Sequence, residues 1–134
     1  MISVHHIGYL VKNIENSLKA FEMLGYQRAY GPVYDSYRDI DVVFLKKDGY
    51  IVELVSPSSE QSVVSNLLKT YKNAPYHICY KSDAFTEDLG RLEKKGFIRF
   101  DGPSPVSVLG GKKTCFLFNM NIGMIELLEK GNFE

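Results

Sequence analysis

The feature that most constrains this sequence is an internal repeat with an offset of 71 residues. The segments His6-Ile7-Gly8-Tyr9 and His77-Ile78-Cys79-Tyr80 agree at three of four positions. Over the first 27 positions of that alignment nine pairs are identical, where composition alone predicts roughly one or two. After a two-residue slip the match resumes, and Glu53-Leu54 corresponds to Glu126-Leu127 at an offset of 73. The sequence therefore contains two copies of one unit.

The length places both copies in one domain. A chain of 134 residues can bury one sizeable core but is short for two independent domains. We expect a single domain over 1–134, with a first module over 1–57, a linker helix within 58–75 and a second module over 76–134.

Charge and hydropathy exclude several classes of partner. The sequence has 16 basic and 16 acidic residues, so no net field attracts nucleic acid or an anionic membrane. No apolar run approaches the roughly 20 residues that cross a bilayer, and the start of the sequence lacks the pattern of a secretion signal. We expect a cytoplasmic protein with no nucleic-acid and no membrane partner. Cys79 and Cys115 lie in apolar strand-like runs and are expected to be reduced, buried thiols.

Hydrophobic spacing predicts the same order of elements in both modules, strand, helix and three strands. For the first module we predict a strand over 2–11, a helix capped by Asn13 and ended by Gly25, and strands over 26–33, 42–46 and 50–55, the second strand broken at Gly31-Pro32. For the second we predict a strand from 76, a helix from about 84 to Gly96, and strands over 97–100, 114–118 and 124–129. A short amphipathic helix over 63–71 links the modules. The prediction is an α+β fold with eight strands and three helices.

The repeat keeps one histidine near the start of each copy and one glutamate near its end: His6 and His77, and Glu53 and Glu126. Singly, a histidine or glutamate in a strand is usually a core or solvated residue. A pseudo-twofold axis between the copies, however, would bring all four side chains to one point. Imidazole nitrogen and carboxylate oxygen suit zinc, nickel, cobalt or manganese, so we predict a divalent metal site formed by these four residues.

These segments resemble the vicinal oxygen chelate superfamily across nearly the whole chain. The resemblance rests on His-Ile-Gly at 6–8, Val52-Glu53-Leu54, His77-Ile78-Cys79 and Ile125-Glu126-Leu127. It implies two tandem βαβββ modules that form a cupped, barrel-like eight-stranded mixed sheet around a divalent ion. The segment from Val52 to His77, and Gly110-Gly111-Lys112 before the next strand, are most similar to methylmalonyl-CoA epimerase-like members. The resemblance implies that His6, His77 and Glu126 are metal ligands, with Glu53 at a position where members carry Glu or Gln.

The resemblance implies a metal-dependent isomerase or epimerase that acts on a thioester or related carbonyl compound. In such an enzyme the metal stabilises an enediolate, while Glu126 and Glu53 move the proton next to the carbonyl. The same ligand set occurs in glyoxalase I-type lactoylglutathione lyases, so that activity is an alternative. A third possibility, from another class, is a non-catalytic protein that binds a small molecule or confers resistance.

One uncertainty concerns the residue that transfers the proton. The epimerases have an acidic residue, proposed for proton transfer, before the third strand; our alignment places Tyr37 there, with Asp35, Asp39 and Asp41 nearby.

The remaining expectations concern substrate and partner contacts. Lys112 and Lys113 are candidates to contact a phosphate or CoA tail, although lysines after a glycine turn are usually solvated. Because sheets of this kind leave edges to cover, we expect a homodimer.

Overall fold

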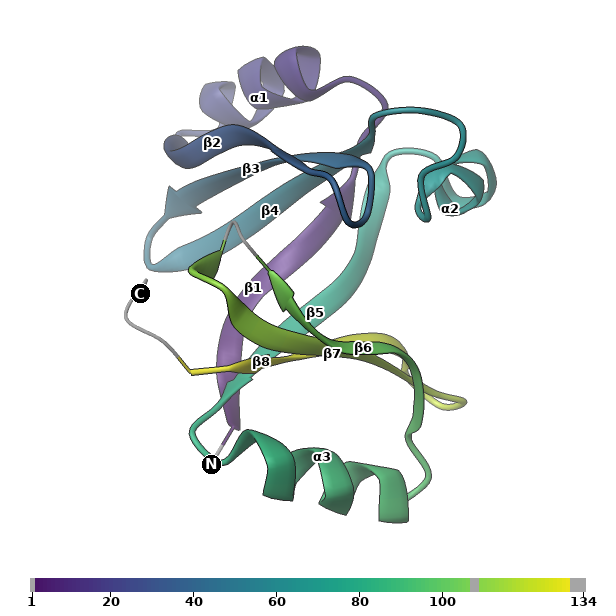
Figure 1. The fold of residues 1–134 in the computed structure, drawn as a ribbon. Helices are drawn as coiled ribbons and strands as arrows, with labels where there is room; N and C mark the ends of the chain where they lie inside the picture. Colours follow the sequence, from purple (N-terminus) through teal and green to yellow (C-terminus); the bar gives the residue numbers. More distant parts are fainter. Residues whose placement is uncertain (1, 107–108, 131–134) are drawn as a thin grey trace. The chain divides into compact units, whose positions relative to one another are not determined.

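The structure is a computed structural model that describes residues 2–106 and 109–130. Within these residues the chain forms eight strands and three helices, whose order in the sequence is seen in Figure 1. The elements are β1 (Ile2–Leu10), α1 (Ile14–Met23), β2 (Gln27–Asp35), β3 (Ile40–Lys47), β4 (Tyr50–Pro57), α2 (Ser65–Tyr71), β5 (Ala74–Ser82), α3 (Phe85–Lys94), β6 (Ile98–Val106), β7 (Lys112–Asn119) and β8 (Gly123–Glu129). The strand order is β2-β3-β4-β1-β5-β8-β7-β6. The predicted α+β class, with the βαβββ order repeated and eight strands in a mixed sheet, is confirmed.

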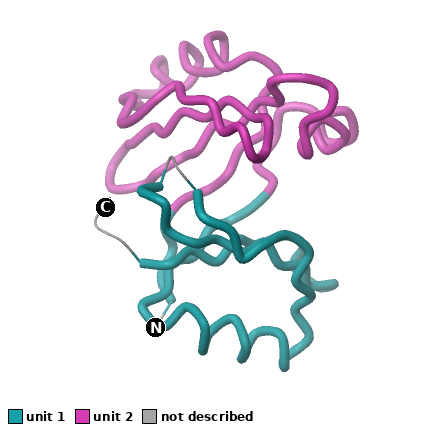
Figure 2. The backbone as a smooth tube through the Cα atoms, in the orientation of Figure 1, with its two compact units in different colours: residues 1–5, 77–134 teal, residues 6–76 magenta. Residues whose placement is uncertain are grey.

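The chain divides into two compact units, coloured separately in Figure 2. One covers residues 6–76 and is called here the N-terminal unit. The other covers residues 1–5 and 77–134, so far as these are described, and is called the C-terminal unit. The strand β1 contributes residues to both. The predicted single domain over 1–134, with its module limits, stays a prediction.

The N-terminal unit packs α1 on one face of the strands β2-β3-β4-β1. Strand β1 runs parallel to β4, and the other neighbours are antiparallel. Side chains alternate between the faces of a strand, so every second residue of β3 and β4 faces the helix. The buried core on this face consists of Val11, Leu18, Val43, Leu45, Val52 and Leu54. The helix starts as expected, because the side chain of Asn13 accepts a hydrogen bond of 2.9 Å from the Asn16 N–H.

The C-terminal unit repeats this packing with α3 and the strands β5-β8-β7-β6. Strand β5 runs parallel to β8, and the other neighbours are antiparallel. Its core consists of Phe85, Leu89, Leu92, Cys115, Leu117, Ile125 and Leu127. The start of α3 differs from that of α1. The buried Ser82 hydroxyl accepts the Ala84 N–H and donates to a carboxylate oxygen of Asp88 at 2.6 Å, so a serine and an aspartate occupy this helix start.

The predicted break at Gly31-Pro32 was wrong. Strand β2 continues through this dipeptide with shifts of register before and after Tyr30, and β6 does the same at Gly102-Pro103. Both Gly-Pro peptide bonds are cis, and both glycines have a positive φ, of 92° and 99°. Because no Cβ is present, the glycine backbone lies against the next strand: a Cβ would meet a carbonyl oxygen at 2.7 Å at position 31 and 2.5 Å at position 102. These residues form bulges, which bend a strand without ending it.

The two-residue slip in the repeat resolves into two single insertions. The first residues of β2 and β6 are 71 positions apart, those of β3 and β7 are 72 apart, and those of β4 and β8 are 73 apart. One residue is therefore added between β6 and β7, and one in the connection between β7 and β8. Every strand of the second module thus keeps the face that its counterpart has in the first.

The two cysteines agree with the expectation from sequence. Cys79 and Cys115 are both free and buried. None of the helices within residues 2–106 and 109–130 is long and apolar enough to span a membrane.

Candidate functional site

The N-terminal unit brings His6 and Glu53 together on the sheet face that lies opposite α1. The strand register pairs Gly8 of β1 with Glu53 of β4, so His6 comes two residues before that pair and points to the same side. The Nε2 atom of His6 lies 3.2 Å from Oε1 of Glu53, and the two side chains are 0% and 11% exposed. Alternation along β4 had predicted that Glu53 faces away from Val52 and Leu54, which pack in the helix-side core.

A phenylalanine completes this group. Phe44 of β3 lies directly opposite Glu53 in the register of β3 and β4. Its ring meets the imidazole of His6 edge to face, with centroids 5.5 Å apart and planes at 80°. This contact covers part of the imidazole with an apolar ring.

The C-terminal unit contains the same group. The register pairs Cys79 of β5 with Glu126 of β8, again two residues after the histidine. The Nε2 atom of His77 lies 3.1 Å from Oε1 of Glu126, and the two side chains are 1% and 6% exposed. Phe116 lies opposite Glu126, and its ring meets His77 at 5.1 Å and 88°. Each unit therefore holds a His–Phe–Glu group, with its histidine and glutamate buried, on the sheet face that its helix leaves free.

Sequence reasoning found the histidines and glutamates but missed the phenylalanines. Phe44 and Phe116 are separated by 72 residues, so neither the 71-residue nor the 73-residue alignment pairs them. Dividing the slip between the two hairpins would have revealed the pair. The structure brings His6 next to Glu53 and His77 next to Glu126. That all four residues bind one ion stays a prediction.

Each pair offers donor atoms that suit a divalent metal ion. A buried carboxylate is costly unless a positive or hydrogen-bonding partner compensates it, and here the partner is an imidazole nitrogen. Imidazole nitrogen and carboxylate oxygen are common ligands of zinc and its neighbours in the first transition row. The donor types therefore fit the divalent ion that the sequence predicted.

The residues proposed around the third strand lie at the end of β2, in the loop that follows it and at the start of β3, in the N-terminal unit. Tyr37 is 67% exposed and stacks on Arg38, with the guanidinium carbon 5.2 Å from the ring centroid. Arg38 in turn donates to the buried Asp35 at 3.2 Å. Asp39 accepts the hydroxyl of Tyr34 at 2.8 Å, and this hydrogen bond raises the pKa of Tyr34.

The carboxylates of Asp39 and Asp41 also accept hydrogen bonds from the segment that follows β4. Asp39 accepts a hydrogen bond from Ser59, and Asp41 accepts one from Ser58 at 2.8 Å. These contacts give both aspartates a structural role in joining two loops. A part of Tyr37, Asp39 or Asp41 in proton transfer stays a prediction that these contacts do not support.

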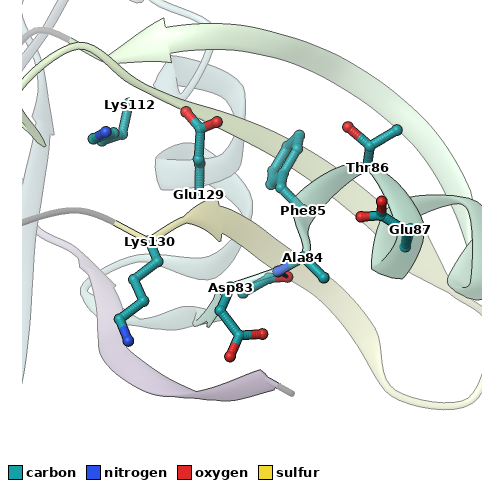
Figure 3. A pocket seen from close by; sticks show the side chains of 9 residues that line it. Asp83, Ala84, Phe85, Thr86, Glu87, Lys112, Glu129 and Lys130 are labelled. Atoms are coloured by element: carbon teal, nitrogen blue, oxygen red, sulfur yellow. Dashed lines mark hydrogen bonds between the residues drawn. The ribbon is translucent and has the colours of Figure 1, made fainter.

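A hollow of about 490 Å³ lies in the C-terminal unit at the start of α3 (Figure 3). Its nine lining residues are Ser82, Asp83, Ala84, Phe85, Thr86, Glu87, Lys112, Glu129 and Lys130, none of which was predicted as a metal ligand. Lys112 borders this hollow together with acidic side chains, and the backbone N–H of Lys113 donates to Glu129 at 3.2 Å. The predicted contact of these lysines with a phosphate or CoA tail stays a prediction.

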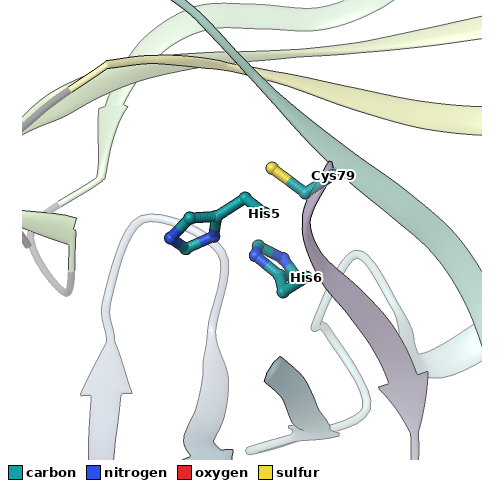
Figure 4. Close-up of side chains that lie close together, drawn as sticks. All are labelled: His5, His6 and Cys79. Carbon is teal, nitrogen blue, oxygen red and sulfur yellow. The ribbon is translucent and has the colours of Figure 1, made fainter. Parts of the chain in front are cut away.

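The buried thiols behave as core residues. Figure 4 shows Cys79 together with His5 and His6, which are consecutive on β1. All three are buried. Burial raises the pKa of the Cys115 thiol to about 11, so this side chain is protonated at neutral pH and is a poor nucleophile.

Comparisons with known proteins give a consistent result. The sequence matches the Glyoxalase/Bleomycin resistance protein/Dioxygenase superfamily over residues 5–116. A mitochondrial methylmalonyl-CoA epimerase from Dictyostelium discoideum is 25% identical over 130 residues, which is 95% of this chain and 78% of the relative.

Solved structures with this fold include two that align along nearly their whole length. A hypothetical protein from Bacillus halodurans C-125 superposes with a TM-score of 0.86 at 20% identity, covering 98% of this chain and 96% of the other. A Streptomyces coelicolor methylmalonyl-CoA epimerase variant, in complex with 2-nitronate-propionyl-CoA, superposes with a TM-score of 0.85 at 17% identity, covering 96% and 94%. At these identities the likeness establishes the fold.

Proposed function

Because the chain belongs to the Glyoxalase/Bleomycin resistance protein/Dioxygenase superfamily, we propose that it is a metal-dependent epimerase acting on a thioester or a related carbonyl compound. The reaction removes the proton from the carbon next to the carbonyl and returns it to the other side. Similarity to a methylmalonyl-CoA epimerase along 95% of the chain supports this reaction among those that the superfamily hosts.

The observation that carries the proposal is the buried imidazole–carboxylate contact in each unit, at 3.2 Å and 3.1 Å. A protein that only binds an apolar molecule has no use for two buried carboxylates, because each costs free energy to desolvate. An enzyme that handles a proton and a cation needs such groups.

In this proposal His6, Glu53, His77 and Glu126 together hold one divalent ion, whose identity is open among zinc, nickel, cobalt and manganese. When bound, such an ion supplies positive charge where negative charge develops on a carbonyl oxygen of the substrate. The homodimer and the cytoplasmic location predicted from sequence stay predictions.

The side chains of this chain then have distinct tasks. The carboxylates of Glu126 and Glu53 take the proton from the carbon and return it. The ring of Phe44 restricts the orientation of the His6 imidazole and shields it from water, and the ring of Phe116 does the same for His77. Low local polarity strengthens the electrostatic interactions that the reaction uses.

Exchange of the α-proton tests the proposal directly. Metal-replete protein is incubated with methylmalonyl-CoA in deuterium oxide, and deuterium at the carbon next to the carbonyl is followed by mass spectrometry. We expect exchange that stops on chelation and returns with a divalent ion. If several ions give no exchange, methylmalonyl-CoA is not the substrate.

Two companion measurements test the alternative functions, a glyoxalase-type lyase and a non-catalytic binding protein. Formation of S-lactoylglutathione from the hemithioacetal of methylglyoxal, without exchange into methylmalonyl-CoA, would identify a glyoxalase-type lyase instead. Elemental analysis that finds no ion in the purified protein, and none bound after incubation, would favour a binding protein without chemistry.

A further inference from the structure

The C-terminal unit presents an apolar strip beside its His–Phe–Glu group. The strip consists of Ile98, Phe100, Phe116 and Phe118. Ile98 of β6 lies directly opposite Phe118 of β7 in the strand register. Phe100 lies near Phe116, with ring centroids 6.0 Å apart. Two residues of β6 and two of the neighbouring strand β7 therefore form one continuous apolar patch on the sheet.

This strip starts at the buried pair and ends in solvent. Phe116 contacts His77 at its inner end. Phe100, Phe118 and Ile98 are 52%, 42% and 64% exposed. Large apolar side chains exposed side by side are unusual in a sheet and mark a surface that binds something.

Of the matching positions in the N-terminal unit, only that of Phe116 carries an aromatic ring, Phe44, and two of the other three are polar. There the register pairs Gln27 of β2 with Lys46 of β3, where the C-terminal unit pairs Ile98 with Phe118. Ala29 stands at the position that corresponds to Phe100 in the repeat. Because the fold is the same in both units, the fold itself does not require the exposed aromatic rings. The strip is specific to the second module.

The size of the strip decides what it can bind. Neighbouring strands lie about 4.8 Å apart and alternate residues about 7 Å apart, so four side chains cover a patch about 10 Å across. A stable protein interface buries roughly 800 Å² on each partner, which is far larger. A hydrocarbon chain of a few methylene groups matches the patch.

We infer that the apolar strip binds the hydrocarbon part of an acyl thioester whose carbonyl lies at the His77–Glu126 pair. This inference rests on the proposed function and adds a substrate class, thioesters with an extended apolar acyl group. The continuity of Phe100 and Phe118 with Phe116, which touches His77, gives such a chain a path from the carbonyl outward. A short acyl group such as methylmalonyl would leave Ile98 and Phe118 uncovered.

The test measures binding rather than turnover. N-acetylcysteamine thioesters with propionyl, butyryl and hexanoyl groups are titrated into the metal-replete protein, and dissociation constants are obtained by calorimetry. Burial of one methylene group strengthens binding about fourfold. We expect the dissociation constant to fall by about that factor for each added methylene.

Two substitutions give the outer strip positions, 98 and 118, the residues that the N-terminal unit carries at its matching positions. Ile98→Gln and Phe118→Lys are changes at exposed positions, so the fold tolerates them. Both variants should lose most of the dependence on chain length while still binding the propionyl thioester. The matched control is Gln27→Ala, at the counterpart of Ile98, which should keep the full dependence.

Several outcomes overturn the inference. Affinity that does not change with chain length, or a Phe118→Lys variant that binds the series as the unaltered protein does, removes the strip as an acyl site. Self-association that Phe118→Lys abolishes without a change in thioester affinity assigns the strip to a second copy of the chain instead. Absence of α-proton exchange with methylmalonyl-CoA and with all the thioesters of the series rejects the proposed reaction, whereas binding that depends on chain length still supports the strip.

Discussion

The two units share their central group and differ around it. His6, Phe44 and Glu53 have the same partners in the N-terminal unit as His77, Phe116 and Glu126 have in the other, and corresponding distances agree within 0.4 Å. Two residues further along the same strand, however, Lys46 in one unit stands where the other has the aromatic ring of Phe118. The duplicated fold thus keeps the positions to which we assign the chemistry in both units, while the neighbouring positions differ, as expected if they contact different parts of one asymmetric substrate.

Replacing the glutamates should have the largest effect and shows whether the two pairs are equivalent in catalysis. Glu126→Gln and Glu53→Gln keep the size of the side chain but remove the basic oxygen. We expect each change to slow α-proton exchange by about 10²- to 10⁴-fold, the range typical of a lost general base. Glu126 is the more buried of the two, so its replacement should be the more severe. Exchange rates measured by mass spectrometry give the comparison, and equal losses would mean that both carboxylates move the proton.

Metal-dependent stability tests whether one ion links both pairs. A ligand at about 100 times its dissociation constant stabilises the folded state by about 2.7 kcal/mol, which raises the melting temperature by several degrees. We expect added zinc or cobalt to produce this shift in the unaltered protein. His6→Ala and His77→Ala, one from each unit, should both lose it. If only one of the two variants loses the shift, the ion belongs to a single unit.

Substitution of the bulge glycines compares the second strands of the two units. A Cβ at Gly31 or Gly102 would lie 2.7 Å or 2.5 Å from a backbone carbonyl oxygen, and both residues have a positive φ. We expect Gly31→Ala and Gly102→Ala each to lower the free energy of unfolding by about 1–3 kcal/mol. Urea denaturation measures the loss. The control is Gly90→Ala in α3, where a Cβ meets nothing within 4 Å and helix propensity should add about 0.5–1 kcal/mol.

The sequence predicted the repeated architecture because each module carries strong local signals. Asn13 and the glycines that end the helices are visible in any single copy, and periodic apolar residues locate both cores. Side-chain alternation also put each glutamate on the correct face. The contact partners of those residues were harder to predict from the sequence, because contacts across strands depend on register. One inserted residue in a hairpin changes every later pairing, which hid Phe44 and Phe116.

No pattern in the sequence predicts that the strand continues through Gly31-Pro32. Glycine and proline usually end a strand, and only the neighbouring strand shows that the chain bulges and resumes its pairing. Similarly, Asp39 in the loop before β3 and Asp41 at the start of β3 accept hydrogen bonds from a segment about 20 residues away. No local pattern specifies such contacts.

Removal of the helix cap in the N-terminal unit should have a smaller effect. Asn13→Ala removes the side-chain oxygen that accepts the Asn16 N–H. The expected loss is about 1 kcal/mol in the free energy of unfolding. A companion Asn13→Ser variant keeps a capping oxygen and should lose much less. Equal destabilisation by both substitutions would show that the asparagine acts through packing and not as a cap.

The start of α3 should give the smallest effect and one that depends on pH. The hydrogen bond from Ser82, followed by that from Arg91, lowers the pKa of Asp88 below its value of 3.8 in an unfolded chain. A carboxyl group with a lowered pKa stabilises the fold above its unfolded pKa, and this contribution disappears as the pH falls through the folded pKa. Asp88→Asn should therefore lower the free energy of unfolding at neutral pH, by about 1 kcal/mol or less, and make no difference in strong acid.

Ser82→Ala provides the partner variant for a double-mutant cycle on this contact. Because the hydroxyl donates to Asp88 at 2.6 Å, its removal should abolish most of the pH-dependent part of the Asp88→Asn effect. Urea denaturation of the four proteins at neutral pH and at about pH 2 gives the coupling free energy at each pH. The matched control at α1 is Asn13→Ala, measured at the same two pH values. Its effect on the free energy of unfolding should not depend on pH, because the cap there is a neutral amide. A coupling between Ser82 and Asp88 that persists unchanged in acid would mean that the neutral carboxyl group holds the serine equally well, and that the charge of Asp88 contributes nothing to the start of this helix.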